Sequence, residues 1–274
     1  MGQDLIVTRD DAHDPAVLHR LYQDLSVLPR MPAALLYIPM ADLERLAAGD
    51  KTVASALAAY VPESLVAFLP AHVDKVRAMA PNQGDLVGVE VFLSRHASMD
   101  HTPHGGLHVD ANEPDWDSAL VRWGSVFHLG PDNVPEGGGT AVYPRLPVPE
   151  QLMSYCFRYT THDELDALAA DWTVVPQKPN RLLVFDGRLP HYACRCRAKP
   201  EAPRTALIVT GWATVPRFAP ERGYSKLTVE QYQAFTHLPE SDVQRARGFL
   251  ELGRERGARV AQVLVDALSA IESI

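Results

Sequence analysis

The sequence has no excess of positive charge and no run of basic residues. It contains 26 Lys and Arg residues against 34 Asp and Glu residues, which gives a formal net charge of −8 at pH 7. Nucleic acids and anionic membrane surfaces are polyanions, and they attract chains with the opposite balance. We therefore expect neither of them to be the main partner of this protein.

Long apolar runs and a secretory signal are also missing. The sequence contains no apolar stretch of about 18 residues, the length that a membrane-spanning helix requires. Residues 1–6 lack the basic and apolar regions of a secretory signal. Gly2 does not complete a myristoylation motif, because Ile6 stands where Ser or Thr is needed. These features predict a cytoplasmic protein without a membrane span.

Cysteine is scarce, since the chain has only Cys156, Cys194 and Cys196. This number cannot build a disulfide framework and therefore indicates a reducing compartment. Cys194 and Cys196 have no second pair that would complete a zinc site, so we interpret both as ordinary thiols. With 46% hydrophobic and 22% charged residues, the composition is typical of a globular protein with a sizeable core.

Helical patterns flank a central block of strand patterns. Ala- and Leu-rich segments with helical spacing predict mostly helix over residues 10–80, and the tail 228–274 is also predicted to be helical, with a break near Pro239. The predicted strands are 85–94, 119–129, 141–143, 172–176, 181–185 and 204–212, with a helical insertion over 149–170. No linker interrupts this order, which predicts a single domain, 1–274, with a barrel or sandwich at its core.

A histidine and a carboxylate two positions apart, His108 and Asp110, end the His-rich stretch 101–110. Side chains two apart on an extended chain point the same way, so both could reach one metal ion. His191 follows the predicted strand 181–185 and could supply a third ligand. Two imidazoles and one carboxylate on one face of a metal form the facial triad associated with non-haem Fe(II) oxygenases.

Arg204 opens the apolar strand that follows His191. A guanidinium inside a cavity can hold a carboxylate through two parallel hydrogen bonds, which lysine cannot match in geometry. Arg195 and Arg197 are alternatives for this role, but they lie in a predicted loop. The sequence therefore favours Arg204 as a carboxylate clamp.

The ordered set of motif residues resembles the Fe(II)/2-oxoglutarate-dependent dioxygenase superfamily. The set comprises His108-x-Asp110, the Gly-rich turn Gly137–Thr140, His191 and Arg204. The resemblance covers about residues 85–214. It implies a mainly β core, a double-stranded β-helix or cupin-like jelly roll over these residues, with helical additions at 1–84 and 215–274.

The resemblance also implies a role for each motif residue. Fe(II) would be held by His108, Asp110 and His191, and O2 and 2-oxoglutarate would be co-substrates. The distal carboxylate of 2-oxoglutarate would pair with Arg204, and Thr140 matches a threonine that contacts the co-substrate in the taurine dioxygenase branch. The implied reaction couples decarboxylation of 2-oxoglutarate, to succinate and CO2, with oxidation of a substrate C–H bond. Asp110 stands where halogenating members have Ala or Gly, so hydroxylation, desaturation or cyclisation is expected.

Several polar residues near these motifs have roles that the sequence leaves open. They are His101, His104, Arg122, Trp123, His128 and Arg145. We interpret His101 and His104 as loop residues or neighbours of the metal ligands, with substrate contact as the alternative. His128 is equally well a core residue or a co-substrate contact, and one of Arg122 and Trp123 should face the barrel interior.

The substrate itself is not readable from any motif. We expect a small molecule, an amino acid or a natural-product intermediate, because the added helices could close over a small pocket. Two alternatives are a cupin-like metal enzyme that does not use 2-oxoglutarate and a non-catalytic jelly-roll binding protein. The C-terminal helices could form a homodimer interface or pack on the barrel, and both alternatives stay open.

Overall fold

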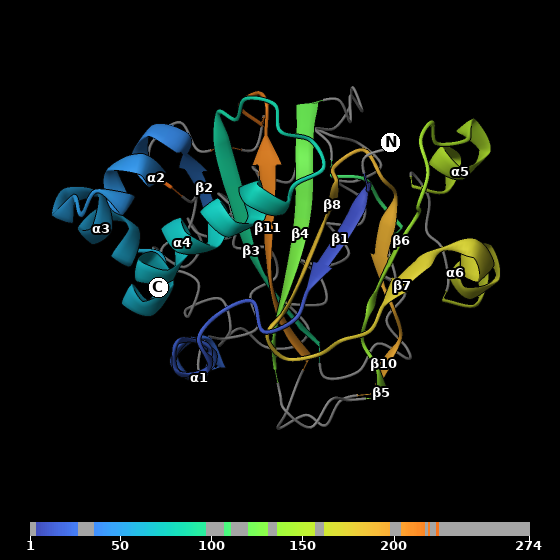
Figure 1. Cartoon of the computed structure of the whole chain (residues 1–274), viewed down its shortest axis with the longest axis horizontal. Helices are drawn as coiled ribbons and strands as arrows, with labels where there is room; N and C mark the ends of the chain where they lie inside the picture. The colour runs from blue at the N-terminus through green and yellow to red at the C-terminus, as the bar shows by residue number, and fades with distance from the viewer. Residues whose placement is uncertain are drawn as a thin grey trace, which may run out of the picture.

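The computed structural model describes three layers of the chain: a large antiparallel sheet, smaller antiparallel sheets, and helices (Figure 1). The described residues are 4–26, 36–96, 107–110, 120–130, 136–156, 162–197, 204–216, 219 and 223–224. The strands are β1 (Ile6–Arg9), β2 (Leu36–Pro39), β3 (Gly88–His96), β4 (Val121–Gly130), β5 (Glu136–Gly137), β6 (Thr140–Val142), β7 (Thr173–Val175), β8 (Arg181–Asp186), β9 (His191–Ala193), β10 (Cys196–Arg197) and β11 (Arg204–Trp212). The helices are α1 (Pro15–Ser26), α2 (Met40–Ala47), α3 (Lys51–Ala58), α4 (Glu63–Met79), α5 (Glu150–Tyr155) and α6 (His162–Leu168), which a 3-10 turn, η2 (Ala169–Asp171), follows.

The strand order is that of a double-stranded β-helix. The large sheet runs β1-β8-β4-β11-β3-β2, and the small sheets run β7-β6-β9 and β10-β5. An isolated antiparallel bridge between His108 and His191 adds the stretch 107–110 beside β9. From β3 to β11 the chain alternates between the large sheet and these smaller strands, as two interleaved Greek keys require. The predicted jelly roll is therefore confirmed, and its strands β3, β4, β6, β7, β8 and β11 fall on the six predicted ranges.

The two faces of the large sheet bury different sets of side chains. On one face, Val91, Trp123 and Leu207 share a core with the apolar residues of α1 to α4. Figure 1 shows α4 crossing this face, with α2 and α3 towards the β2 edge and α5 and α6 on the side of the small strands. On the other face, Val126 and Ala206 pack against small-sheet residues. This second face is the interior of the barrel.

Two strands of the large sheet differ from the prediction. Residues 10–80 were expected to be mostly helical, but Leu36–Pro39 forms β2, which pairs with β3, and Ile6–Arg9 forms β1, which pairs with β8. Both strands are four residues long, too short for an alternating pattern to stand out, and Pro39 ends β2 at the sheet edge. The segment 1–84 thus adds both edges of the large sheet as well as four helices.

The predicted C-terminal helices lie outside the described residues, so the helical tail, the homodimer interface and the single-domain organisation stay predictions. In the part of the chain that the structure describes, no single helix is long and apolar enough to cross a membrane. The helices α3 and α4 pass that test only together, as a pair bent by 119°.

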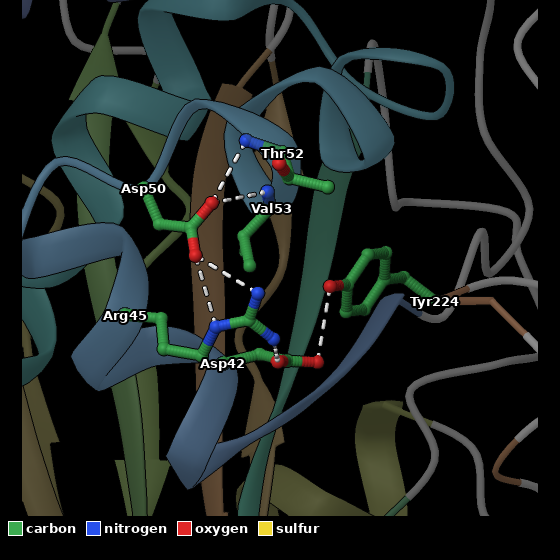
Figure 2. A network of polar contacts seen from close by, with 6 residues as sticks. All are labelled: Asp42, Arg45, Asp50, Thr52, Val53 and Tyr224. Carbon is green, nitrogen blue, oxygen red and sulfur yellow. Dashed lines mark hydrogen bonds and ion pairs between the residues drawn. The ribbon is translucent and has the colours of Figure 1, made fainter.

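Tyr224 ties the described end of the chain to the helical layer (Figure 2). Its hydroxyl donates to Asp42 at 3.0 Å, and its carbonyl accepts from the backbone N–H of Tyr37 at 2.8 Å. Arg45 forms ion pairs with Asp42 and with Asp50, at 3.1 and 2.8 Å. Asp50 also accepts hydrogen bonds from the backbone N–H groups of Thr52 and Val53 in the first turn of α3. These bonds and the interaction with Arg45 lower the pKa of Asp50. One network thus joins α2, α3 and the segment at residue 224.

A pair of histidines, one fully buried and one half-buried, lies between α4 and the large sheet. His72 is fully buried, and its Nδ1 lies 3.0 Å from Nε2 of His13. The rings of Phe68 and Phe127 lie 4.9 and 5.2 Å from the His72 ring. Burial lowers the pKa of His13 to about 4 and that of His72 well below its usual value, and the charge of Lys75 adds to both shifts. Both imidazoles are therefore neutral in the folded protein near neutral pH.

We expect the free energy of unfolding to fall as the pH drops below about 6.5, because the unfolded chain then binds protons that the folded histidines cannot take up. The stabilisation by the two neutral histidines is fully present above about pH 6.5. It is lost progressively as the pH falls from that value to the pKa values of the folded protein. For the fully buried His72 the slope approaches about 1.4 kcal/mol per pH unit. Urea unfolding across this range should show a shallower slope for His72→Phe than for the wild type. The exposed His19→Gln serves as the control, and equal slopes in all three proteins would contradict the assignment.

Candidate active site

Three side chains that can bind metal meet between the large sheet and the small strands. His108, Asp110 and His191 each offer one ligand atom, and these atoms all lie within 4.8 Å of one another. Nε2 of each histidine lies 3.7 Å from Oδ1 of Asp110. The structure thus brings together the three residues that the sequence selected, and their donor set of two imidazoles and one carboxylate fits Fe(II).

The backbone holds the two histidines side by side. The N–H of His108 donates to the carbonyl of His191 at 3.1 Å, and the N–H of His191 donates to the carbonyl of His108 at 2.9 Å. Leu107 and Val109 are buried, whereas His108 and Asp110 face the opposite way. The alternation that an extended chain imposes therefore places the imidazole and the carboxylate on one side, as the spacing predicts.

Neighbouring groups fix the orientation of the ligands. Nδ1 of His191 lies 3.1 Å from the carbonyl of Leu189, and the Phe185 ring lies 4.5 Å from the imidazole. Burial lowers the pKa of His191 to about 4, so the imidazole is neutral, and the tautomer whose Nδ1–H donates to the carbonyl of Leu189 leaves Nε2 without a proton and able to bind metal. The hydroxyl of Thr210 donates to Oδ2 of Asp110 at 3.3 Å, which leaves Oδ1 turned towards the two histidines.

Arg204 lies inside the barrel at the start of β11. It is 1% exposed, its Nε donates to the carbonyl of Gly138, and its Nη1 donates to Ser94 at 3.4 Å. No carboxylate among the described residues forms an ion pair with it. Burial also lowers its pKa, which reports the cost of holding the charge away from water. A bound anion would offset that cost.

Buried polar atoms without hydrogen-bond partners lie around this arginine. In the described part of the chain they include both ring nitrogens of His128, the hydroxyl of Thr140 and Oε1 of Gln177. Burial lowers the pKa of His128 to about 3, and the charge of Arg204 contributes to this shift. Buried polar groups are normally paired, so these atoms indicate a polar ligand. His128 is thus no satisfied core residue.

Gly138 makes the approach of these side chains possible. A Cβ at this position would lie 2.5 Å from Oε1 of Gln177 and 3.2 Å from Cδ of Arg204. Its φ of +76° is also one that glycine adopts without strain. The Gly-rich turn that ends at Thr140 thus leaves room for the arginine and brings the Thr140 hydroxyl to the same part of the barrel.

The sequence reasoning missed Glu90, which lies on the barrel face of β3 opposite Thr210. Nε1 of Trp212 donates to its carboxyl group at 3.2 Å. Burial, and after it the charge of Asp110, raises the pKa of Glu90 to about 8. A signal was present, since Glu90 is the one charged residue in the apolar run from Val87 to Leu93.

The remaining candidates lie away from the metal ligands or outside the described residues. Trp123 packs in the core on the helix side, and Arg122 lies against the backbone of residues 84–85. Arg145 lies over the ring of Tyr143. Arg195 pairs with Asp163 and Asp166, and Arg197 is exposed, so neither competes with Arg204 as a buried clamp. His101 and His104 lie outside the described residues.

No family model and no curated protein matches this sequence. Among solved structures, HygX from Streptomyces hygroscopicus, with nickel, 2-oxoglutarate and hygromycin B bound, is 14% identical over 83% of this chain and 95% of that chain, with a TM-score of 0.44. The non-haem α-ketoglutarate-dependent epimerase SnoN from nogalamycin biosynthesis is 18% identical over 77% of each chain, with a TM-score of 0.43. A Pseudomonas putida prolyl-4-hydroxylase is 13% identical over 77% of this chain and 94% of that chain, with a TM-score of 0.39.

Proposed function

We propose that this protein is a non-haem Fe(II)- and 2-oxoglutarate-dependent oxygenase that acts on a small molecule, an amino acid or a natural-product intermediate. One observation carries the proposal. The cluster of His108, Asp110 and His191 shares the barrel interior with the buried Arg204, which has no carboxylate partner among the described residues. A metal centre and an anion clamp inside one barrel are what a metal-chelating dicarboxylate co-substrate requires.

The residues of the chain divide the work between them. Asp110 and the two histidines would hold Fe(II), which when bound supplies the place where O2 and the co-substrate react. Arg204 binds the distal carboxylate of 2-oxoglutarate and so orients the other end of that molecule towards the metal ligands. Thr140, His128 and Gln177 offer further polar contacts at the arginine end.

The outcome of the reaction is proposed from the ligand set. Asp110 provides a carboxylate where a halogenating enzyme needs space for a halide, so we propose hydroxylation, desaturation or cyclisation of the substrate. The two alternatives, a metal enzyme that does not use 2-oxoglutarate and a non-catalytic binding protein, give no reason for a buried Arg204. The desolvation of that guanidinium therefore favours the 2-oxoglutarate-dependent reaction over both.

An anaerobic titration tests the proposed function. Fe(II) added to the metal-free protein, followed by 2-oxoglutarate, should produce the weak visible charge-transfer band of a chelated complex. Admission of O2 should then yield succinate. Metal binding without the band would favour the enzyme that does not use 2-oxoglutarate, and failure to bind either component would favour the non-catalytic binding protein.

A further inference from the structure

Glu90 lies beside the metal ligands at the end of the barrel away from Arg204. On β11, Thr210 is the residue paired with Glu90, and the hydroxyl of Thr210 holds Asp110. Arg204 lies six positions earlier on the same face of β11. If 2-oxoglutarate extends from Arg204 to the metal ligands, Glu90 lies beyond it, on the side that is left for substrate.

Only one of the two oxygen atoms of the Glu90 carboxyl group has a hydrogen-bond partner among the described residues. Oε2 accepts from the indole N–H of Trp212, and Oε1 has no partner among the described residues. No Lys, Arg or His in the described part of the chain forms an ion pair with it. Glu90 is half-buried, and burial together with the charge of Asp110 raises its pKa to about 8, so its ionised form is costly; a ligand that brings a positive charge would stabilise that form.

Tyr37 supplies a second polar atom without a partner on the same face of the sheet. On β2 it is the residue paired with Glu90, so both side chains lie on the same face of the sheet. Tyr37 is 6% exposed, and its buried hydroxyl has no hydrogen-bond partner. The hydroxyl lies over Gly88, where a Cβ would be only 2.3 Å away. The missing side chain of Gly88 thus makes room for this hydroxyl.

Apolar side chains complete the surroundings. Phe92 and Ile208 are paired residues of β3 and β11 on the same barrel face, and both are partly exposed. They lie between the Glu90 end and the Arg204 end of the interior. They therefore line the space that 2-oxoglutarate would occupy, and they separate Arg204 from Glu90 and Tyr37 at the substrate end.

We infer that the substrate carries a protonated amine, and that Glu90 and Tyr37 bind this amine beside the metal centre. The inference rests on the proposed function. An ammonium group has three donors and no acceptor, so it satisfies Oε1 of Glu90 and the Tyr37 hydroxyl together. A purely structural role for Glu90, as the acceptor for Trp212, would leave the buried Tyr37 hydroxyl without a partner.

Ligand-observed NMR on the full chain, loaded with diamagnetic Zn(II) and 2-oxoglutarate, tests the inference without turnover. The probes are 2-phenylethylamine and its uncharged counterpart 2-phenylethanol. We expect the wild type to bind the amine about tenfold more tightly than the alcohol, as a desolvated charge pair allows. Glu90→Gln keeps the shape and an acceptor for Trp212 but removes the charge, and should bring the ratio to about one. Glu90→Asp keeps the charge and should keep the preference.

The exposed Glu44→Gln on α2 is the matched control and should leave the ratio unchanged. A wild type that binds both probes equally, or binds no amine, overturns the inference, as does a Glu90→Gln variant that keeps the preference. Calorimetry with Zn(II) and 2-oxoglutarate comes first, and the probe ratio is also measured with Zn(II) alone. If the wild type does not bind 2-oxoglutarate, the proposed function is contradicted. If the wild type binds Zn(II) and 2-oxoglutarate but does not prefer the amine, only the role of Glu90 and Tyr37 is contradicted.

Discussion

Asp110→Ala should lower Fe(II) affinity and succinate formation by more than about 100-fold, because changes to groups that merely support metal ligands already cost about 10- to 100-fold. The substitution removes the only carboxylate ligand of the cluster and leaves two imidazoles. Oδ1 is the atom that both histidines face at 3.7 Å, so the two remaining ligands have no carboxylate between them. Anaerobic Fe(II) titration and succinate assays measure the two effects.

Thr210→Val provides a graded comparison for this prediction. It keeps the volume of the side chain but removes the hydroxyl that donates to Oδ2 of Asp110. Thr210 is a positioning residue, so its substitution should lower the Fe(II) affinity by about tenfold, which is less than the loss expected from removing the ligand itself. If the Asp110→Ala protein bound Fe(II) with wild-type affinity, the metal site could not be formed by these three residues.

The metal ligands could be predicted because their signal is local. Alternation along an extended chain places His108 and Asp110 on one side, and the structure shows this, with Leu107 and Val109 buried on the other side. Only the meeting with His191 required the fold, and the resemblance of the ordered motif supplied that expectation. The long apolar strands were predictable for the same reason, since β11 has the predicted bounds.

Residues that owe their place to strand register were not predictable in this way. Tyr37 belongs to a four-residue strand inside a region with helical patterns, and it meets Glu90 only because β2 pairs with β3. Gln177 follows the short strand β7 and reaches Arg204 across Gly138. Nothing near these residues in the sequence marks them, because their partners come from distant strands.

Arg204→Gln should lower the affinity for 2-oxoglutarate by about 100-fold, because truncating one member of a buried charge pair costs about 2–5 kcal/mol. The guanidinium is fully buried, and the carbonyl of Gly138 and the hydroxyl of Ser94 hold it in place. Arg204→Lys keeps the charge but loses the planar two-point geometry, so its affinity should fall between those of the wild type and the Gln variant. Calorimetry on the Zn(II)-loaded proteins measures these affinities.

Fe(II) affinity separates loss of the clamp from loss of the fold. It should remain near the wild-type value in Arg204→Gln, because the three metal ligands lie at the other end of the interior. Arg195→Gln is the matched control, since Arg195 was the rival in the sequence and forms its ion pairs with Asp163 and Asp166 instead. If Arg195→Gln weakened 2-oxoglutarate binding as much as Arg204→Gln, the carboxylate would bind elsewhere. A loss confined to Arg204 places the co-substrate along β11, between the clamp and the metal ligands.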